Sequence, residues 1–208
     1  MSDKSMVNLN LRRISYAVVV ATGSVAAGCG AYVGYLQVSG NFHQVIPGEL
    51  YRSGQPSAED LGAYVQTYGI KTVVNLRGFH PEKAWYRDEV AMSKGLGVTH
   101  IDFGISASKD LPAEKAAQLV AFMKSAPKPI LVHCQSGADR SGLVAALYVH
   151  QVAGQSEETA RGQLSFYYGH VGIPLLSAAY AMDRSWQAIE TRDNHQISAA
   201  ANRVEALR

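Results

Sequence analysis

The chain has 208 residues, enough for one domain of ordinary size and an additional segment. Its 19 Lys and Arg residues nearly balance its 17 Asp and Glu residues, and 47% of the residues are hydrophobic. This composition excludes a disordered chain and argues against a strongly basic nucleic-acid-binding protein, so we expect no nucleic-acid partner. The two cysteines, Cys29 and Cys134, belong to no CxxC motif or Cys/His cluster, so we expect neither a disulfide framework nor a metal centre.

The first predicted element is an N-terminal transmembrane helix. Residues 14–48 contain no Asp, Glu, Lys or Arg, and residues 14–38 form an apolar run longer than the ~20 residues that a helix needs to cross a bilayer. Three basic residues and one acid precede this run, so the positive-inside rule predicts a cytoplasmic N-terminus. We therefore expect residues 1–39 to be a cytoplasmic stub and membrane anchor, with the rest of the chain on the far side, which is the periplasm in a bacterium.

Three other interpretations of this segment stay open. A cleaved secretory signal has the same basic start and apolar middle, and the small residues at 26–31 would suit a signal peptidase, in which case the remaining chain is secreted. The run Ala-Ala-Gly-Cys at residues 26–29 faintly resembles a lipoprotein cleavage site, but the sequence after Cys29 stays apolar where a lipoprotein usually turns polar. The third interpretation is a buried helix of a soluble protein.

The remaining chain predicts alternating strands and helices. Residues 40–52 indicate a linker that leads into a strand, and a helix then begins at Ser57, where Asp60 completes a capping-box pattern, and ends at Gly69. The later elements are strands at 71–76, 98–103 and 129–133, a polar loop at 77–81, and helices at 82–94, 112–126, 142–152, 156–168 and 175–191.

This alternation predicts an α/β domain over residues 40–192, with a mostly parallel central sheet flanked by helices. The polar residues 193–208 are expected to form a loosely ordered tail.

Most of the functional information lies in residues 130–142, ILVHCQSGADRSG. This segment has Cys134 at the end of a buried strand, then a loop that contains glycine, then Arg140 at the start of a helix. Ligands of α/β folds bind beyond the carboxyl ends of strands, and helix N-termini present free N–H groups to anions. We therefore expect the backbone of residues 135–140 to form a nest for a tetrahedral oxyanion.

The same loop predicts a thiolate nucleophile. The helix dipole, the backbone N–H groups and the Arg140 guanidinium all favour the ionised form of Cys134. The planar fork of Arg140 can hold two phosphate oxygens, and the Ser141 hydroxyl can donate a hydrogen bond to the sulfur. The expected phosphate ligands are Gln135, Ser136, Gly137, Ala138, Asp139 and Arg140.

With HC, a glycine three residues after the cysteine, and RSG in place, the loop resembles the HCxxGxxR[ST]G signature of cysteine-dependent protein phosphatases, in particular their compact dual-specificity and atypical dual-specificity branch. The runs LYRSGQPS at 50–57, YGIKTVVNLR at 68–77 and RGQLSFYYGH at 161–170 resemble this family's early strand, second strand and late helix. The resemblance implies a protein tyrosine phosphatase-like fold and a two-step hydrolysis without metal or cofactor.

In that mechanism Cys134 attacks phosphorus to form a phosphocysteine, which water then hydrolyses, while His133 tunes the thiolate through hydrogen bonds. Family members carry a general acid upstream of the cysteine, and Asp102, 32 positions before Cys134, fits this separation. Asp110 is closer and lies near a helix start, where capping is its expected role. Asp139 is the alternative acid, because the loop resembles the GxDR[ST]G loop of some bacterial relatives, which use that Asp in place of a missing upstream acid.

The loop has no lysine, and Asp139 would repel additional phosphates. This favours phosphotyrosine, with phosphoserine or phosphothreonine as further substrates, over phosphoinositides and other small phosphomonoesters. Arg77 and His80 are candidates for lining the entrance to the site or are ordinary solvated loop residues.

Two other classes of protein remain in view. A rhodanese-type sulfur transferase also uses a cysteine after a buried strand, but its loop is usually shorter by one residue. A catalytically idle phosphate-binding module is the other, and the intact Cys134 and Arg140 argue against it. The expected partners are therefore a phosphorylated protein or small phosphomonoester, and the membrane through residues 14–38.

Overall fold

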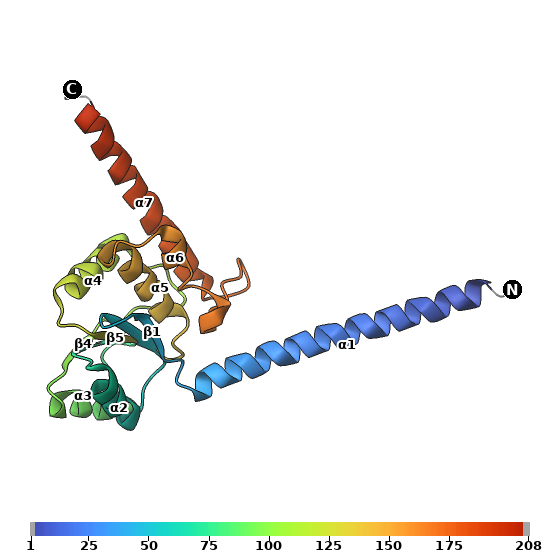
Figure 1. Ribbon diagram of the computed structural model, residues 1–208, viewed down its shortest axis with the longest axis horizontal. Helices are drawn as coiled ribbons and strands as arrows, with labels where there is room; N and C mark the ends of the chain where they lie inside the picture. Colours follow the sequence, from blue (N-terminus) through green and yellow to red (C-terminus); the bar gives the residue numbers. More distant parts are fainter. Residues whose placement is uncertain (1–2, 206–208) are drawn as a thin grey trace. The chain divides into compact units, whose positions relative to one another are not determined.

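The computed structural model describes the backbone of residues 3–205 and the side chains of residues 15–192. The chain forms two compact units, Met1–Ser39 and Gly40–Arg208. The first contains a single helix, α1 (Asp3–Val38), drawn in blue in Figure 1. Its segment Ser15–Val38 has a mean hydropathy of 1.6 and is long and apolar enough to cross a membrane. A signal sequence has the same length and composition, so this helix is a candidate for either a membrane span or a signal sequence.

The second unit is built on a five-stranded sheet with the strand order β1-β2-β5-β3-β4. Only β1 is antiparallel to its neighbour, whereas β2, β5, β3 and β4 are parallel. The predicted α/β fold with a mostly parallel sheet is therefore confirmed. The strands are β1 (His43–Ile46), β2 (Leu50–Ser53), β3 (Thr72–Asn75), β4 (Thr99–Asp102) and β5 (Ile130–His133).

Residues 40–52 were expected to form a linker that leads into one strand, but they contain the additional strand β1, which forms a hairpin with β2. Gly48, with φ of +72°, supplies the left-handed conformation that the turn between the two strands requires. The Pro47-Gly48 pair suits both a linker and a hairpin turn, so the sequence alone does not reveal β1.

Helices cover both faces of the sheet (Figure 1). The helices α2 (Ala58–Tyr68) and α3 (Ala84–Gly95) lie on one face, and α4 (Ala113–Ser125), α5 (Asp139–Leu147) and α7 (Tyr180–Glu205) lie on the other. Along β5, Leu131 packs under α2 and α3, whereas Ile130 and Val132 pack with α5. Because side chains alternate along a strand, His133 points toward the α3 face and Cys134 joins the core on the α5 face.

The capping box predicted for α2 is confirmed. Ser57 Oγ accepts a hydrogen bond from the Asp60 backbone at 3.0 Å, and the Asp60 carboxylate accepts one from the Ser57 backbone at 3.2 Å. Gly69 ends the helix with φ of +67°.

The last third of the chain differs from the expectation. The helix predicted from residue 142 begins at Asp139 and continues as the π-helix η1 (Tyr148–Val152). The helix predicted at 156–168 is broken into α6 (Glu157–Arg161) and η2 (Phe166–Tyr168). Helix α7 begins at Tyr180 rather than near residue 175, because Leu175 has φ of +65°, which a right-handed helix does not allow. It continues to Glu205, into the residues for which a loosely ordered tail was expected.

Candidate active site

The loop of residues 134–140 connects β5 to α5 at the carboxyl edge of the sheet. It turns at Gly137, which has φ of +76°. A Cβ atom at this position would lie 2.6 Å from the backbone nitrogen of Gly54 and 2.8 Å from the carbonyl carbon of Ser53. Only glycine therefore fits, because the 134–140 loop is pressed against the end of β2.

Successive carbonyl groups of the loop are bonded to the surrounding protein. The Gln135 carbonyl accepts a hydrogen bond from the Gln55 backbone at 3.1 Å. The Ser136 carbonyl accepts one from Asn41 Nδ2 at 2.8 Å. Nη2 of Arg52 donates to the carbonyls of the next two residues, Gly137 at 2.8 Å and Ala138 at 2.9 Å.

These contacts orient the backbone N–H groups. A trans peptide holds its C=O and N–H in opposite directions, so four outward-bonded carbonyls turn the following N–H groups to the other side of the loop. The N–H groups so directed belong to Ser136, Gly137, Ala138 and Asp139. Convergent N–H groups at a helix N-terminus form a nest that suits a tetrahedral oxyanion.

Arg52 is a functional residue that the sequence reasoning missed. Its side chain is fully buried, its Nη1 donates to Gln163 at 2.8 Å and 3.0 Å, and its guanidinium lies 4.0 Å from the centre of the Tyr168 ring. Burial lowers its pKa to about 10. An arginine inside an otherwise buried strand was the signal available in the sequence, because such a charge requires several acceptors.

The predicted nucleophile Cys134 is 1% exposed, and its Sγ lies 3.2 Å from Oγ of Ser141. Nη1 of Arg140 donates to the carbonyls of Leu76 at 3.2 Å and Ile105 at 3.5 Å, which follow β3 and β4. The sulfur and the hydroxyl thus lie together, whereas the guanidinium is bonded to the segments that follow β3 and β4.

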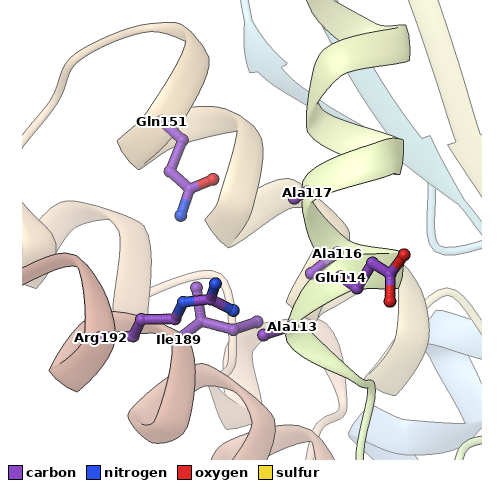
Figure 2. Close-up of a pocket in the computed structure, with 7 residues that line it drawn as sticks. All are labelled: Ala113, Glu114, Ala116, Ala117, Gln151, Ile189 and Arg192. Carbon is purple, nitrogen blue, oxygen red and sulfur yellow. The ribbon is translucent and has the colours of Figure 1, made fainter. Parts of the chain in front are cut away.

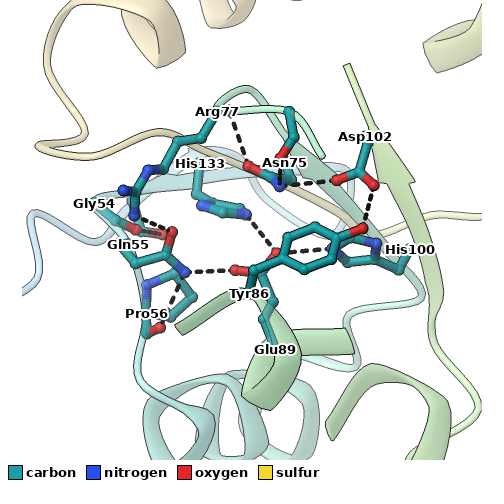
Figure 3. A network of polar contacts seen from close by, with 12 residues as sticks. Gly54, Gln55, Pro56, Asn75, Arg77, Tyr86, Glu89, His100, Asp102 and His133 are labelled. Atoms are coloured by element: carbon teal, nitrogen blue, oxygen red, sulfur yellow. Dashed lines mark hydrogen bonds and ion pairs between the residues drawn. The ribbon is translucent and has the colours of Figure 1, made fainter. Parts of the chain in front are cut away.

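His133 belongs to a buried network on the other face of the sheet (Figure 3). Its Nε2 lies 3.2 Å from Oε1 of Glu89, which also lies 2.7 Å from Nε2 of His100. Gln55 Nε2 donates to the second oxygen of Glu89 at 2.5 Å. Burial favours the protonated acid, but the hydrogen bonds from His100 and His133 outweigh it and lower the pKa of Glu89 to about 2. An ionised carboxylate therefore contacts His133, the residue directly before Cys134.

Arg77 extends this network beyond Gln55, as Figure 3 shows. Its Nη1 donates to Gln55 Oε1 at 2.8 Å, and its guanidinium lies 3.6 Å from the centre of the Trp85 ring. Burial and the nearby positive charge of Arg140 lower the pKa of Arg77. His80 is half exposed, and its Nδ1 lies 3.4 Å from the Glu82 carboxylate.

The three candidate acids have different surroundings. Asp102 ends β4, where Asn75 Nδ2 donates to its Oδ1 at 2.9 Å and the Tyr86 hydroxyl donates to its Oδ2 at 2.5 Å (Figure 3). Burial and this carboxylate raise the pKa of Tyr86. Asp102 and His133 both pair with Asn75 in the sheet, so their backbones are two strands apart, about 10 Å.

Asp139 lies inside the loop, with its Oδ1 2.7 Å from Nδ1 of His170, and Nε2 of that ring lies 2.9 Å from Oδ2 of Asp183. Burial alone would lower the pKa of His170, but the two aspartates outweigh it and raise the pKa. His170 ends the segment RGQLSFYYGH, which resembles a late helix of the family, but the sequence alone predicts no role for it.

Asp110 is exposed and pairs with Arg184, whose Nη2 lies 2.6 Å from its Oδ1. The N-cap of α4 is Pro112, which makes no side-chain capping bond. The capping role expected for Asp110 is therefore wrong, because the N-cap lies two residues later and the carboxylate is paired with Arg184 of α7.

A pocket of about 270 Å³ opens elsewhere in the domain (Figure 2). Residues of α4, η1 and α7 line it, and none of them belongs to the 134–140 loop. Its lining residues are Ala113, Glu114, Ala116, Ala117, Gln151, Ile189 and Arg192. Within the described residues, no three His, Cys, Asp or Glu side chains are grouped to hold a metal ion.

Comparison with known proteins identifies a family for the chain. A family model described as "DSP-PTPase phosphatase fused to NAD+ Kinase" matches residues 40–173. The chain belongs to this family of phosphatases. The resemblance identified in the 134–140 loop is thereby confirmed, and the DSP-PTPase domain is a hydrolase of phosphomonoesters. No curated protein sequence matches the chain.

Solved phosphatases share the fold. TpbA of P. aeruginosa is 24% identical over 73% of this chain and 92% of its own, with a TM-score of 0.54. The catalytic domain of the PP-IP phosphatase SIW14 of S. cerevisiae is 22% identical over 79% of this chain and 93% of its own, with a TM-score of 0.56. A DUF442 putative phosphatase of Shewanella putrefaciens is 20% identical over 74% of this chain and 91% of its own, with a TM-score of 0.51.

Proposed function

We propose that this DSP-PTPase domain hydrolyses phosphotyrosine, and phosphoserine or phosphothreonine in addition, through a phosphocysteine on Cys134. The observation that carries the proposal is the 134–140 loop, whose Gly137 and Ala138 carbonyls are bonded to Arg52 and whose buried thiol lies 3.2 Å from the Ser141 hydroxyl. The absence of lysine from this loop favours a substrate with a single phosphate. TpbA, which shares the fold, has been solved as a cysteine-to-serine variant in complex with phosphotyrosine.

The proposed reaction has two steps. The Cys134 thiolate attacks phosphorus, the bond to the leaving oxygen breaks, and a general acid gives that oxygen a proton. Water then attacks the phosphocysteine, the same residue takes its proton, and the sulfur leaves with a hydrogen bond from Ser141. The loop N–H groups and Arg140 bind the remaining phosphate oxygens and stabilise the charge of both transition states.

For the general acid, the contacts support Asp139 over Asp102. The Asp102 carboxylate is bonded to Asn75 and Tyr86 on the α3 face, whereas Cys134 packs on the opposite face of the sheet. Asp139 is part of the 134–140 loop, and Nδ1 of His170, 2.7 Å from its Oδ1, holds the carboxylate in place. We therefore assign the acid to Asp139 and keep Asp102 as the alternative.

Substitution of each aspartate tests this assignment. Asp139→Asn is expected to lose about 100-fold in turnover of phenyl phosphate, a poor leaving group, and much less with p-nitrophenyl phosphate. Asp110→Asn serves as the control because its carboxylate pairs with Arg184 at the surface. A selective loss in Asp102→Asn instead would transfer the role to Asp102, and a loss in neither would refute both assignments.

The activity itself is tested with the full chain in detergent. Release of phosphate from p-nitrophenyl phosphate and from a phosphotyrosine peptide is expected, and Cys134→Ser should abolish it. Phosphate release that persists in Cys134→Ser would refute the proposed nucleophile. Failure of the unsubstituted chain to release phosphate would favour an idle phosphate-binding module.

A second candidate substrate is a small molecule with several phosphates, because Arg77 adds a cation beside Arg140. SIW14, which shares the fold, is a PP-IP phosphatase. Comparison of kcat/KM for a phosphotyrosine peptide and an inositol polyphosphate decides between the two. Arg77→Gln should reduce the second value selectively if that substrate is the natural one.

For the location in the cell, we propose that α1 anchors the phosphatase domain in the membrane, with the N-terminus in the cytoplasm. The apolar segment Ser15–Val38 and the basic residues before it support this topology. Reporter fusions after Arg208 test it, because alkaline phosphatase is active only outside the cytoplasm. Recovery of a shortened soluble protein would instead support a cleaved signal.

A further inference from the structure

An apolar loop lies between α6 and α7 of the phosphatase domain. Residues 162–182 contain no Asp, Glu, Lys or Arg. Large hydrophobic side chains are nevertheless exposed there, with Leu175 fully exposed and Leu176 83% exposed. In Figure 1 this orange-red segment stands out from the neighbouring helices. The exposed residues of this apolar loop are Phe166, Tyr167, Val171, Ile173, Leu175 and Leu176.

The tip of the loop has a defined conformation. The Ile173 carbonyl accepts hydrogen bonds from the backbones of Leu176 at 3.1 Å and Ser177 at 2.9 Å, which close a turn. Leu175 lies in that turn with φ of +65°, a conformation that is unfavourable for a branched side chain. The two leucines are not buried within their own domain, and the hydrogen-bonded turn keeps them exposed.

The start of the domain contacts the same segment. Asn41 Nδ2 donates to the Tyr168 carbonyl at 2.9 Å, and the His43 ring lies 5.4 Å from the Tyr167 ring. Asn41 is only three residues beyond Val38, where the candidate membrane span ends. Three residues of extended chain reach at most about 10 Å, so the covalent chain alone keeps this segment near the point where it leaves a bilayer.

We propose that the apolar loop inserts Leu175 and Leu176 into the boundary between headgroups and acyl chains of the bilayer that α1 crosses. Leucine at the tip with phenylalanine and tyrosine beside it is the composition of an interfacial membrane contact. The charged groups that face the base of the loop are Arg52, which bonds Gln163 and the 134–140 loop, and Asp139, His170 and Asp183, which are paired with one another. The proposal rests on the proposed membrane anchor and is independent of the substrate.

This contact would hold the 134–140 loop at the membrane surface. The Asn41 amide that donates to Tyr168 also donates to the Ser136 carbonyl of the 134–140 loop at 2.8 Å. Docking of the apolar loop therefore restrains the phosphate-binding loop next to the lipid and favours phosphate groups carried close to the membrane.

Tryptophan fluorescence in liposomes tests the proposal. The full chain with Leu175→Trp is reconstituted into phosphatidylethanolamine and phosphatidylglycerol whose acyl chains are brominated either near the headgroup or near the bilayer centre. Leu96→Trp is the matched control, since Leu96 is an exposed leucine at the end of α3. We expect quenching of Leu175→Trp by the shallow bromine to exceed that of the control about twofold, and the deep bromine to be less effective. Adding Leu176→Asp should reduce the quenching to the control level.

Several results would overturn the proposal. Equal quenching of Leu175→Trp and Leu96→Trp would mean that the loop does not reach lipid. Release of the full chain from liposomes by alkaline extraction would show that α1 does not anchor the protein in the bilayer, and the proposal depends on that anchor. A Leu175→Trp spectrum already shifted to the blue in detergent, together with a doubled mass by light scattering, would assign the loop to a contact between two copies.

The same samples separate this proposal from the proposed function. Hydrolysis of p-nitrophenyl phosphate by Leu175→Trp should match the unsubstituted chain. Quenching without cysteine-dependent turnover would contradict the enzymatic proposal alone, and turnover without quenching would contradict the docking proposal alone.

Discussion

Oε1 of Glu89, on α3, lies 3.2 Å from Nε2 of His133, the residue directly before Cys134. Both side chains are buried. Because Glu89 has a pKa of about 2, it is ionised at neutral pH and holds a proton on Nε2 of His133. The orientation and tautomer of that ring are therefore set by a helix on the face of the sheet opposite to the thiol.

Glu89→Gln removes this charge while retaining the shape of the side chain. We expect kcat/KM for p-nitrophenyl phosphate to fall about tenfold and the free energy of unfolding to fall by about 1–3 kcal/mol, since a buried hydrogen-bonded charge is lost. Asp88→Asn, an exposed position on the same helix, is the control and should change stability by less than about 0.5 kcal/mol. Unchanged kinetics in Glu89→Gln would limit the role of Glu89 to packing.

Arg52→Lys keeps the positive charge but loses the fork that bonds Gly137, Ala138 and Gln163. We expect a loss of about 3 kcal/mol in the free energy of unfolding, because buried acceptors lose their donors, together with a fall in kcat. Arg87→Lys, at an exposed position of α3, should leave both quantities unchanged. Chemical denaturation and turnover of an aryl phosphate measure the two effects, and a lysine tolerated at position 52 would contradict the proposed clamp.

Gly137→Ala should disrupt the phosphate-binding loop. The added methyl would lie 2.6 Å from the Gly54 nitrogen, so the loop must move and turnover should fall below detection. Gly154→Ala is a matched control, because Gly154 also has a positive φ, +66°, but nothing lies within 4 Å of the added methyl. It should cost about 1–2 kcal/mol of stability and no activity. Equal effects of the two substitutions would show that backbone strain, and not the contact with Gly54, decides the outcome.

The pH dependence of stability reports on His170. The aspartates on either side of this ring raise its pKa, so the folded protein binds the proton more tightly than the unfolded chain. The resulting stabilisation is fully present below the ordinary pKa of about 6.5 and is lost as the pH rises through the folded-state value. Urea denaturation at a series of pH values should therefore reveal a decrease above pH ~6.5 that is reduced in His170→Asn and retained in His80→Asn. An identical decrease in His170→Asn would assign the dependence to other groups.

The features predicted correctly from the sequence are those with short-range causes. The capping box of α2 and the buried runs of β3 and β5 depend on neighbours within a few residues. The 134–140 loop was found in the same way, since a strand, a glycine turn and a helix start follow one another directly.

The features that were missed depend on partners far along the chain. Arg52 and Gln163 are 111 positions apart, and Glu89 and His133 are 44 positions apart. Neither pairing leaves a periodic pattern, because a single buried polar residue in a strand or helix looks like any other interruption. The break between α6 and η2 was missed for a related reason, since it lies where Ser165 is extended, with φ of −136°, and the sequence around this residue gives no sign of that conformation.

The contact between Gly137 and Gly54 also limits how substrate preference can change by mutation. The backbone of the 134–140 loop is fixed by this contact and by the bonds from Asn41 and Arg52, so its shape cannot be altered in small steps. Gln135 is exposed and Ser136 is partly exposed, and both are bonded to their surroundings through their carbonyls. Their side chains can therefore vary while the loop keeps its form, which makes these two positions the natural targets for redirecting the enzyme to a different phosphate ester.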